Sequence, residues 1–395
     1  MTGALVEVAG VFLRLGCLSF GGPVAHIGYL RAELVDKRRW LDDAHYVDLV
    51  ALCQFLPGPA SSQVVFALGM QRAGLLGALV ASACFTLPSA LLMIAFAYGV
   101  SLASDLSRAG WLHGLKLAAV AVVAQAVWGM GKKLCPDRPR ISLCIGSAAV
   151  LLAVPGALAQ LGTIVFGALV GWWLYRNTIA VGSAPVGAAT TRGHVAAAAA
   201  LVAFLALLVA LPALASASGA HLVAVFDSFY RSGSLVFGGG HVVLPLLRAE
   251  VVPRGWLSDQ QFLAGYGAAQ ALPGPLFAFS AYLGAAMGGP ARWAIGLWCL
   301  LAIFLPAWLL IGGALPFWHH IRAKRWAQAA LAGANASVVG VLLAALYSPV
   351  ITESVHSTRD VAAALLAFGL LEHWKAPPWL VVIGMAAAGQ WVLGR

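Results

Sequence analysis

Long apolar segments separated by short polar ones dominate the pattern of this sequence. Because about 20 apolar residues make one helix that crosses a bilayer, the pattern predicts thirteen helical elements. They lie near residues 4–30, 46–70, 74–103, 110–131, 141–155, 157–175, 195–217, 222–247, 262–287, 292–317, 326–347, 360–371 and 378–394. We therefore predict an all-α integral membrane protein with about 12–13 transmembrane elements.

Composition supports this class and excludes others. Hydrophobic residues make up 61% of the 395 positions and charged residues only 10%, whereas a soluble domain carries about a quarter charged residues. The polar stretches are loop-sized, so soluble enzymatic chemistry is not expected. The 24 Lys and Arg against 14 Asp and Glu are typical of cytoplasmic loops in a membrane protein, and no basic run indicates nucleic-acid binding.

An internal repeat relates the two ends of the chain. Residues 12–59 align with residues 229–275 after one gap, with 20 identities in 48 columns. The identities include Phe20-Gly21-Gly22 with Phe237-Gly238-Gly239, Trp40 with Trp256, and Pro57-Gly58-Pro59 with Pro273-Gly274-Pro275. We expect an N-terminal half over 1–176, a linker with one extra helix over 177–221, and a C-terminal half over 222–395.

The number of elements between the two halves predicts their orientation. Six elements per half plus one extra helix is an odd number, so the second half should enter the membrane upside down. Inverted repeats of this kind, with broken helices in matching positions, are common in secondary transporters.

Basic residues indicate which loops face the cytoplasm. Loops after even-numbered elements hold Arg72, Lys132, Lys133, Arg138, Arg140, Arg176, Arg192, Arg248, Arg254, Arg322, Lys324, Arg325 and Lys375. Loops after odd-numbered elements hold Arg31, Lys37, Arg38, Arg39, Arg108, Arg292 and Arg359. This favours a multi-pass protein with a cytoplasmic N-terminus, but it leaves the Lys37-Arg38-Arg39 cluster outside unless the first elements are re-entrant hairpins.

Helix breakers interrupt the apolar segments at matching positions of the two halves. Broken backbone is tolerated at membrane depth where it is buried in protein or lines a watery cavity, and a restarting helix offers free N–H groups to an anion. Kinks for packing are the alternative. The candidate substrate-binding residues at the breaks are Phe20, Gly21, Gly22, Pro23, Pro57, Gly58, Pro59, Phe237, Gly238, Gly239, Gly240, Pro273, Gly274 and Pro275.

Polar side chains on the same segments extend the candidate site. Arg14 and Arg231 occupy equivalent positions and could bind an anion, or snorkel or pair with Glu7 and Asp227. Gln54 and Gln270, three residues before each Pro-Gly-Pro, could bind substrate or stabilise the broken backbone. Candidates for coupling or gating are His26, Glu33, Asp48, His241 and Glu250.

Metal, cofactor and nucleotide chemistry have no signal in the sequence. No two of the six cysteines are spaced as CxxC, and neither a Walker A motif nor HExxH nor GxSxG is present. We expect no metal site, no cofactor and no catalytic residues.

The motifs resemble those of the chromate ion transporter family in its long, two-domain form. The stretch FLRLGCLSFGGPVAHIGYLRAELV, with Trp40 and QFLPGP, is echoed by FYRSGSLVFGGGHVVLPLLRAEVV, with Trp256 and QALPGP. The resemblance covers almost the whole chain. It implies export of chromate from a bacterial cytoplasm across the inner membrane, driven by the membrane potential or a proton gradient, and chromate resistance.

Two other hypotheses stay open at this stage. A carrier of sulfate or another oxyanion is the nearer one, because binding geometry scarcely separates isosteres. A membrane enzyme that reduces chromate through Cys17 and Cys53 is the more distant one. The expected partners are chromate or sulfate and the lipid bilayer, with no nucleic acid, and a homodimer is an arrangement that the sequence leaves open.

Overall fold

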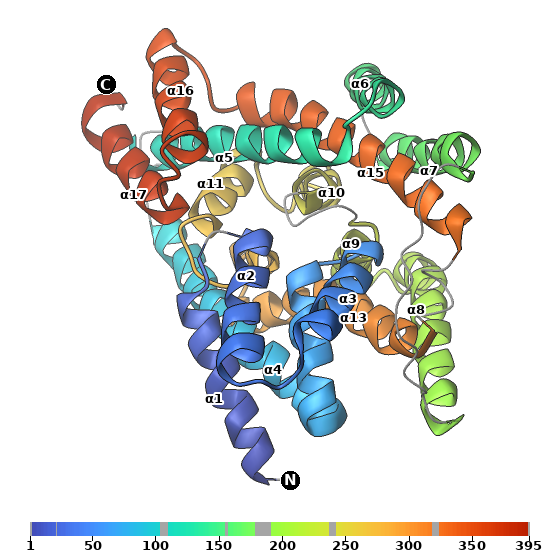
Figure 1. Ribbon diagram of the computed structural model, residues 1–395. Helices are drawn as coiled ribbons and strands as arrows, with labels where there is room; N and C mark the ends of the chain where they lie inside the picture. Colours follow the sequence, from blue (N-terminus) through green and yellow to red (C-terminus); the bar gives the residue numbers. More distant parts are fainter. Residues whose placement is uncertain are drawn as a thin grey trace.

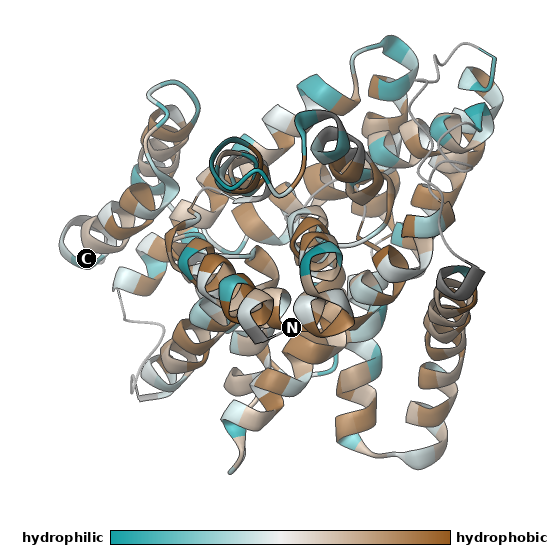
Figure 2. Cartoon of the chain, turned by 60° about the horizontal axis from the view of Figure 1, so that its bottom comes forward, coloured by the Kyte–Doolittle hydropathy of each residue, from teal (hydrophilic) through white to brown (hydrophobic). Residues whose placement is uncertain are grey.

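The computed structural model describes residues 2–20, 22–102, 110–154, 157–177, 191–236, 242–317 and 324–393. Every regular element in these ranges is a helix, and hydrophobic residues cover the long helices while hydrophilic ones gather at helix ends and in loops (Figure 2). Among the described residues, five helices are long and apolar enough to cross a membrane, at Ala60–Ser101, Gly110–Leu134, His194–Ser218, Arg292–Phe317 and Arg325–Ile351. The chain is therefore an all-α membrane protein.

The helices follow the predicted segments closely (Figure 1). The first part of the chain forms α1 (Thr2–Leu18), α2 (Gly22–Arg31), η1 (Ala32–Lys37), α3 (Asp43–Phe55), α4 (Ala60–Leu102), α5 (Gly110–Leu134), α6 (Arg138–Ala153), α7 (Ala157–Tyr175) and α8 (Thr191–Ser218). The second part forms α9 (His221–Ser234), α10 (Val243–Val251), α11 (Asp259–Ala269), η3 (Leu276–Ala278), α12 (Phe279–Ala286), α13 (Arg292–Ala314), η4 (Leu315–Phe317), α15 (Arg325–Ala345), η5 (Leu346–Ile351), α16 (Thr358–Glu372), α17 (Pro378–Ala388) and η6 (Gly389–Leu393).

Four of the predicted elements, near 4–30, 46–70, 222–247 and 262–287, are each two helices rather than one. The pairs are α1 with α2, α3 with the start of α4, α9 with α10, and α11 with α12, which continues directly from the single turn η3. The interruptions fall at the glycine and proline motifs because proline lacks a backbone N–H and glycine adopts conformations closed to other residues. Gly22, Gly58 and Gly274 have φ of 77°, 120° and 86°.

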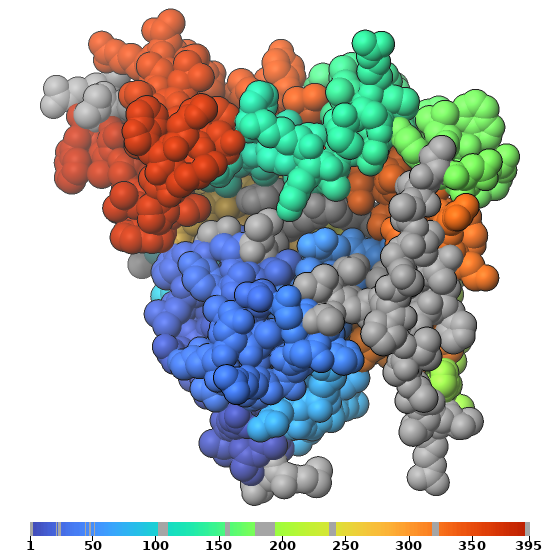
Figure 3. All heavy atoms as spheres, viewed as in Figure 1, coloured from blue at the N-terminus to red at the C-terminus, as the bar shows by residue number. Residues whose placement is uncertain are grey.

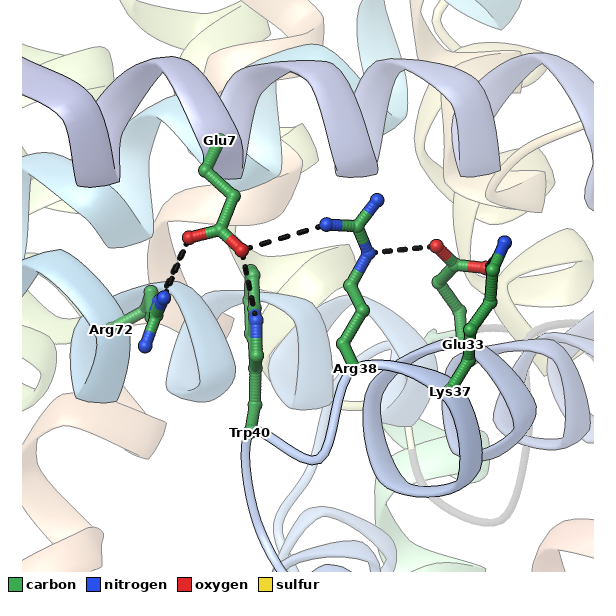
Figure 4. A network of polar contacts seen from close by, with 6 residues as sticks. All are labelled: Glu7, Glu33, Lys37, Arg38, Trp40 and Arg72. Atoms are coloured by element: carbon green, nitrogen blue, oxygen red, sulfur yellow. Dashed lines mark hydrogen bonds and ion pairs between the residues drawn. The ribbon is translucent and has the colours of Figure 1, made fainter.

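The chain turns back after α1, so the loop after η1 returns to the start of α1 (Figure 4). Glu7 on α1 accepts hydrogen bonds from Trp40 Nε1 at 3.2 Å and from Arg72 at 2.6 Å, and Arg38 lies 3.5 Å away. The loop carrying Lys37, Arg38 and Arg39 therefore lies at the same end of the molecule as Arg72. The loop count of the sequence had placed them on opposite sides, because it treated residues 4–30 and 46–70 as single spans.

Helix α4 is itself a hairpin. Its backbone leaves the helical region at Ala73 and Gly74, and Gly69 packs directly against Gly77. Residues eight apart would be about 12 Å apart in a straight helix, so residues 60–72 and 75–102 must run back along one another. The second of these arms is the first long span of the chain.

Two bundles result, and each takes helices from both halves of the chain. Helices α1–α4 pack with α9, α12 and α13, and α8 lies along α9 and α13. Helices α5–α7 pack with α15–α17, so the C-terminal helices lie beside α5 above the N-terminal helices (Figures 1 and 3). His113 on α5 and Asp360 on α16 join the two halves of the second bundle at 2.7 Å.

Small residues set the close helix contacts in the second bundle. Gly167 and Gly171 of α7 face Gly333 and Ser337 of α15, where an added Cβ would collide with the opposite helix. Membrane helices associate through such close backbone packing because lipid tails compete for every apolar side chain. The second bundle is therefore a tightly packed scaffold, while the first bundle contains the helix breaks.

Candidate functional site

Breaks from the two halves of the chain meet at reciprocal backbone hydrogen bonds. The amide of Gly58 donates to the carbonyl of Val236 at 2.7 Å, and the amide of Gly274 donates to the carbonyl of Ser19 at 2.8 Å. Gly58 and Gly274 are equivalent in the repeat alignment, and so are Ser19 and Val236. Each Pro-Gly-Pro break is thus held against the end of the broken helix of the other half, and the breaks converge on one place.

Equivalent close contacts between helices lie next to the two breaks. Gly16 of α1 lies against the backbone of Phe85 in α4, and Gly233 of α9 lies against the backbone of Ile303 in α13. Each contact is beside an in-helix proline, Pro88 or Pro306, which leaves one carbonyl of the preceding turn without its helical partner. Glycine at 16 and 233 is required because any side chain would separate the paired helices.

Polar side chains from the first half surround the break at Ser19. His26 of α2 is 1% exposed. Its Nε2 lies 3.1 Å from the carbonyl oxygen of Ser19 and its Nδ1 lies 3.5 Å from Ser61 Oγ. The ring also packs edge-on against Phe85. His26 was a candidate from sequence, but Ser19 and Ser61 were not, because serines in apolar helices carry no signal of their own.

A third unpredicted residue, Gln63, holds the first Pro-Gly-Pro. It is fully buried, and its Nε2 donates to the carbonyl of Pro57 at 2.8 Å. Gln63 Oε1 has no partner among the described residues. Of the predicted glutamines, Gln54 is exposed, whereas Gln270 is half-buried and its Nε2 is enclosed without a described partner. The two glutamines therefore occupy different environments despite their equivalent positions.

Part of the predicted site lies outside the described residues. Gly21, Phe237, Gly238, Gly239, Gly240 and His241 belong to this group, and the side chains of Pro23 and Asp48 are likewise not described. Phe20 is described, and its ring lies 6.2 Å from the ring of Trp379 at the start of α17. The tip of the first hairpin thus contacts the second bundle.

The two equivalent arginines have different surroundings. Arg231 bonds both carboxylate oxygens of Asp227, with distances between 2.9 and 3.1 Å, and lies 3.0 Å from Glu250. Arg14 is exposed on α1, and Gly10 stands where the second half has Asp227. Among the described residues, neither guanidinium bonds a residue of a helix break.

Ion pairs recur at the outer ends of the broken helices. Arg31 bonds Asp43 at 2.6 Å, and its equivalent Arg248 bonds Asp259 at 2.6 Å. Glu33 and Glu250 each accept from a basic residue four positions later, Lys37 at 3.3 Å and Arg254 at 3.0 Å. These pairs tie α2 to α3 and α10 to α11, so Glu33 and Glu250 lie in charge networks at hairpin ends rather than at the breaks.

A cavity of about 290 Å³ lies between α10 and helices α6, α7 and α15 of the second bundle. Arg248, Gln160 and Ser348 provide its polar lining.

Of the two cysteines considered for redox chemistry, Cys17 is exposed on α1 and Cys53 is buried in α3. The described residues contain no group of three His, Cys, Asp or Glu side chains that could hold a metal ion.

Comparison with known proteins gives one family. The model of the chromate transporter family matches residues 6–172 and again residues 223–390. A chromate transport protein of Pseudomonas aeruginosa is 33% identical over 394 residues, covering 95% of this chain and 89% of that protein.

Two further relatives also match nearly the whole chain. A chromate transport protein of Cupriavidus metallidurans is 28% identical over 98% of this chain and 93% of its own length. A probable chromate transport protein of Synechococcus elongatus is 25% identical over 98% of this chain and 95% of its own. No solved structure matches the chain.

Proposed function

Because the chain belongs to the chromate transporter family, we propose that it exports chromate from the cytoplasm through the region where its helix breaks meet. The observation that carries this proposal is the exchange of hydrogen bonds between Gly58 and Val236 and between Gly274 and Ser19. Broken backbone from both halves of an inverted repeat is where secondary transporters bind substrate. A tetrahedral oxyanion suits the helix N-termini that such breaks expose.

We propose that the hairpins of the two halves enter the membrane from opposite faces. The long arm of α4 and helices α5 to α8 make five crossings between the first hairpins and α9, and an odd number inverts the second half. The face shared by Glu7, Arg38 and Arg72 then also carries Lys132, Arg140, Arg176, Lys324, Arg325 and Lys375, and the opposite face carries Arg248, Arg254, Arg292 and Arg359. The positive-inside rule assigns the first face, with the N-terminus, to the cytoplasm of a bacterial inner membrane.

The membrane potential supplies the driving force in this proposal. Moving one charge through 100 mV is worth about 2.3 kcal/mol, so a dianion that leaves a negative interior gains about twice that amount. Coupling to protons is therefore not required. His26, buried beside Ser19 and Ser61, is a titratable side chain next to the breaks and is the candidate if a proton gradient contributes.

The two arginines receive separate roles. Arg231, bound by Asp227 and Glu250, holds α9 to α10 and has no free charge for a substrate. Arg14 lacks the counterpart of Asp227, and no acidic partner for it is present in the part of the chain that the structure describes. We assign Arg14 the task of attracting the anion toward the tip of the first hairpin.

Uptake of chromium-51 chromate into everted membrane vesicles tests the proposal. Vesicles that contain the protein should accumulate chromate above vesicles that lack it, and collapse of the membrane potential should abolish the difference. Collapse of the pH gradient alone should leave most of it. Vesicles with folded protein and no uptake would contradict chromate export, and addition of sulfate as a competitor would then reveal whether another oxyanion is carried.

A further inference from the structure

Where the breaks meet, the two halves have the same backbone turn but different side chains. Continuing the repeat register past the two Pro-Gly-Pro motifs pairs Ser61, Ser62 and Gln63 with Phe277, Ala278 and Phe279. His26 pairs with Val243. The backbone keeps the same turn in both halves, since the amide of Ser62 bonds Pro59 at 2.9 Å and the amide of Ala278 bonds Pro275 at 2.9 Å.

The first turn of α4 has donors with no acceptor among the residues that the structure describes. The amides of Ser62 and Gln63 both bond the carbonyl of Pro59, and the two preceding amides, of Ala60 and Ser61, have no acceptor within the helix. Ser62 is 3% exposed, and its hydroxyl has no hydrogen-bond partner among the described atoms. Leaving a buried hydroxyl unpaired costs about 1–3 kcal/mol.

The Ser62 hydroxyl belongs to the same turn as the free amides. Side chains of a helix tilt toward its N-terminus, and serine is too short to reach beyond its own turn. Gln63 sets the shape of this turn by holding the carbonyl of Pro57, and Gly58 leaves room for the Gln63 amide because a Cβ there would lie 2.9 Å from Gln63 Nε2. Gln63 is therefore a positioning residue.

We propose that the oxyanion binds at the first turn of α4, on the side of the first half only, where the Ser62 hydroxyl and the amides of Ala60 and Ser61 converge. The equivalent turn of the second half, which begins at Leu276, is lined by buried apolar residues and closes the opposite side. This inference rests on the proposed function and adds the residues that contact the substrate. Arg14 attracts the anion and Ser62 binds it.

Equilibrium binding of chromium-51 chromate to the purified full-length protein in detergent tests the assignment. Ser62→Ala should weaken binding about tenfold or more, because a hydrogen bond to a charged ligand is worth about 1.5–3 kcal/mol. The matched control is Ser280→Ala in the second half. Ser280 is fully buried, and its hydroxyl donates to the carbonyl of Phe277 in the preceding turn, η3, so binding should stay within twofold of the wild type.

A second variant and a folding measurement keep the test decisive. Gln63→Leu should weaken binding and also lower the thermal unfolding temperature, because it frees the Pro57 carbonyl, whereas Ser62→Ala should leave that temperature unchanged or raise it. Chromate binding by the wild type with no loss in folded Ser62→Ala would overturn the assignment of the first turn of α4. Absence of chromate binding by the folded wild type would instead contradict the proposed function.

Discussion

Glu7 on the first helix accepts two hydrogen bonds from Arg72, at 2.6 and 3.2 Å, across 65 positions of the chain. The guanidinium of Arg72 also lies 5.1 Å from the ring of Trp40. This contact gathers the N-terminus, the loop after η1 and the bend in α4 at one end of the molecule. It is the clearest sign that the first two predicted spans are hairpins.

Removal of this pair should loosen the hairpins by a measurable amount. Because the two side chains are 30% and 42% exposed, we expect a coupling free energy of about 1 kcal/mol in a Glu7→Ala and Arg72→Ala double-mutant cycle. Thermal unfolding in detergent measures it. The pair Lys132 and Glu372, 4.0 Å apart, serves as the control and should show coupling near zero. Equal coupling in both cycles would mean that Glu7 does not organise this end.

Alanine at either Pro-Gly-Pro glycine should damage both folding and transport. Gly58 and Gly274 have positive φ, and an added Cβ would lie 2.9 Å from Gln63 Nε2 or 2.8 Å from Ser89 Oγ. We expect each substitution to cost about 2–3 kcal/mol of unfolding free energy. Gly146→Ala in α6, where nothing lies within 4 Å, is the control and should be neutral or slightly stabilising. Normal vesicle transport by both break variants would contradict the site.

Substitution of the two equivalent arginines should have different consequences. Arg231→Ala leaves the carboxylates of Asp227 and Glu250, which are 4% and 10% exposed, without their shared partner, and should cost about 3–5 kcal/mol. Arg14→Ala should leave the protein folded and lower chromate transport at least tenfold. The amount of folded protein in the membrane, compared with uptake per molecule, separates the two effects. Identical behaviour of the two variants would refute the separate roles.

Cysteine labelling tests the opposite entry of the two sets of hairpins. In a background without native cysteines, Lys37→Cys should react with an impermeant maleimide only in everted vesicles, because the proposed orientation puts its loop on the cytoplasmic face. Arg254→Cys should react only in right-side-out vesicles. Labelling of both positions from one side would contradict the inverted arrangement, and labelling after detergent solubilisation shows that each thiol is reactive.

The loop between α5 and α6 should make stability depend on acid pH. Burial alone would raise the pKa of Asp137, but bonds from the Arg140 side chain and backbone and from Tyr175 outweigh it and lower this pKa from 3.8 to about 2. The stabilisation is present above pH 4 and is lost as pH falls toward 2. Because Asp137 is 34% exposed, we expect about 1 kcal/mol.

Thermal unfolding of Asp137→Asn measures this contribution. The asparagine can still cap α6 but carries no charge. The unfolding temperature of the variant should therefore lie below that of the wild type at pH 6 and approach it as the pH falls. A difference that does not change with pH would assign the effect to packing rather than to the charge.

The sequence by itself determined the class of the protein, the positions of nearly all helices and the sites of the breaks. Apolar segments long enough for a bilayer leave few alternatives to helices. Glycine and proline interrupt helices through their own backbone properties, which do not depend on tertiary contacts. The repeat also indicated that Gly58 and Gly274 are equivalent. Only the tertiary structure shows that the amides of these glycines bond the carbonyls of Val236 and Ser19, each in the other half.

Tertiary structure decided which polar groups meet. Whether residues 4–30 cross or fold back depends on contacts of Glu7 with Arg38, Trp40 and Arg72, which are distant in sequence and invisible to hydropathy. The difference between Arg14 and Arg231 arises partly from Asp227, which is Gly10 in the first half, and partly from Glu250, which only the fold brings to Arg231. Ser62 could not be singled out from sequence, because only packing buries its hydroxyl away from any partner among the described residues.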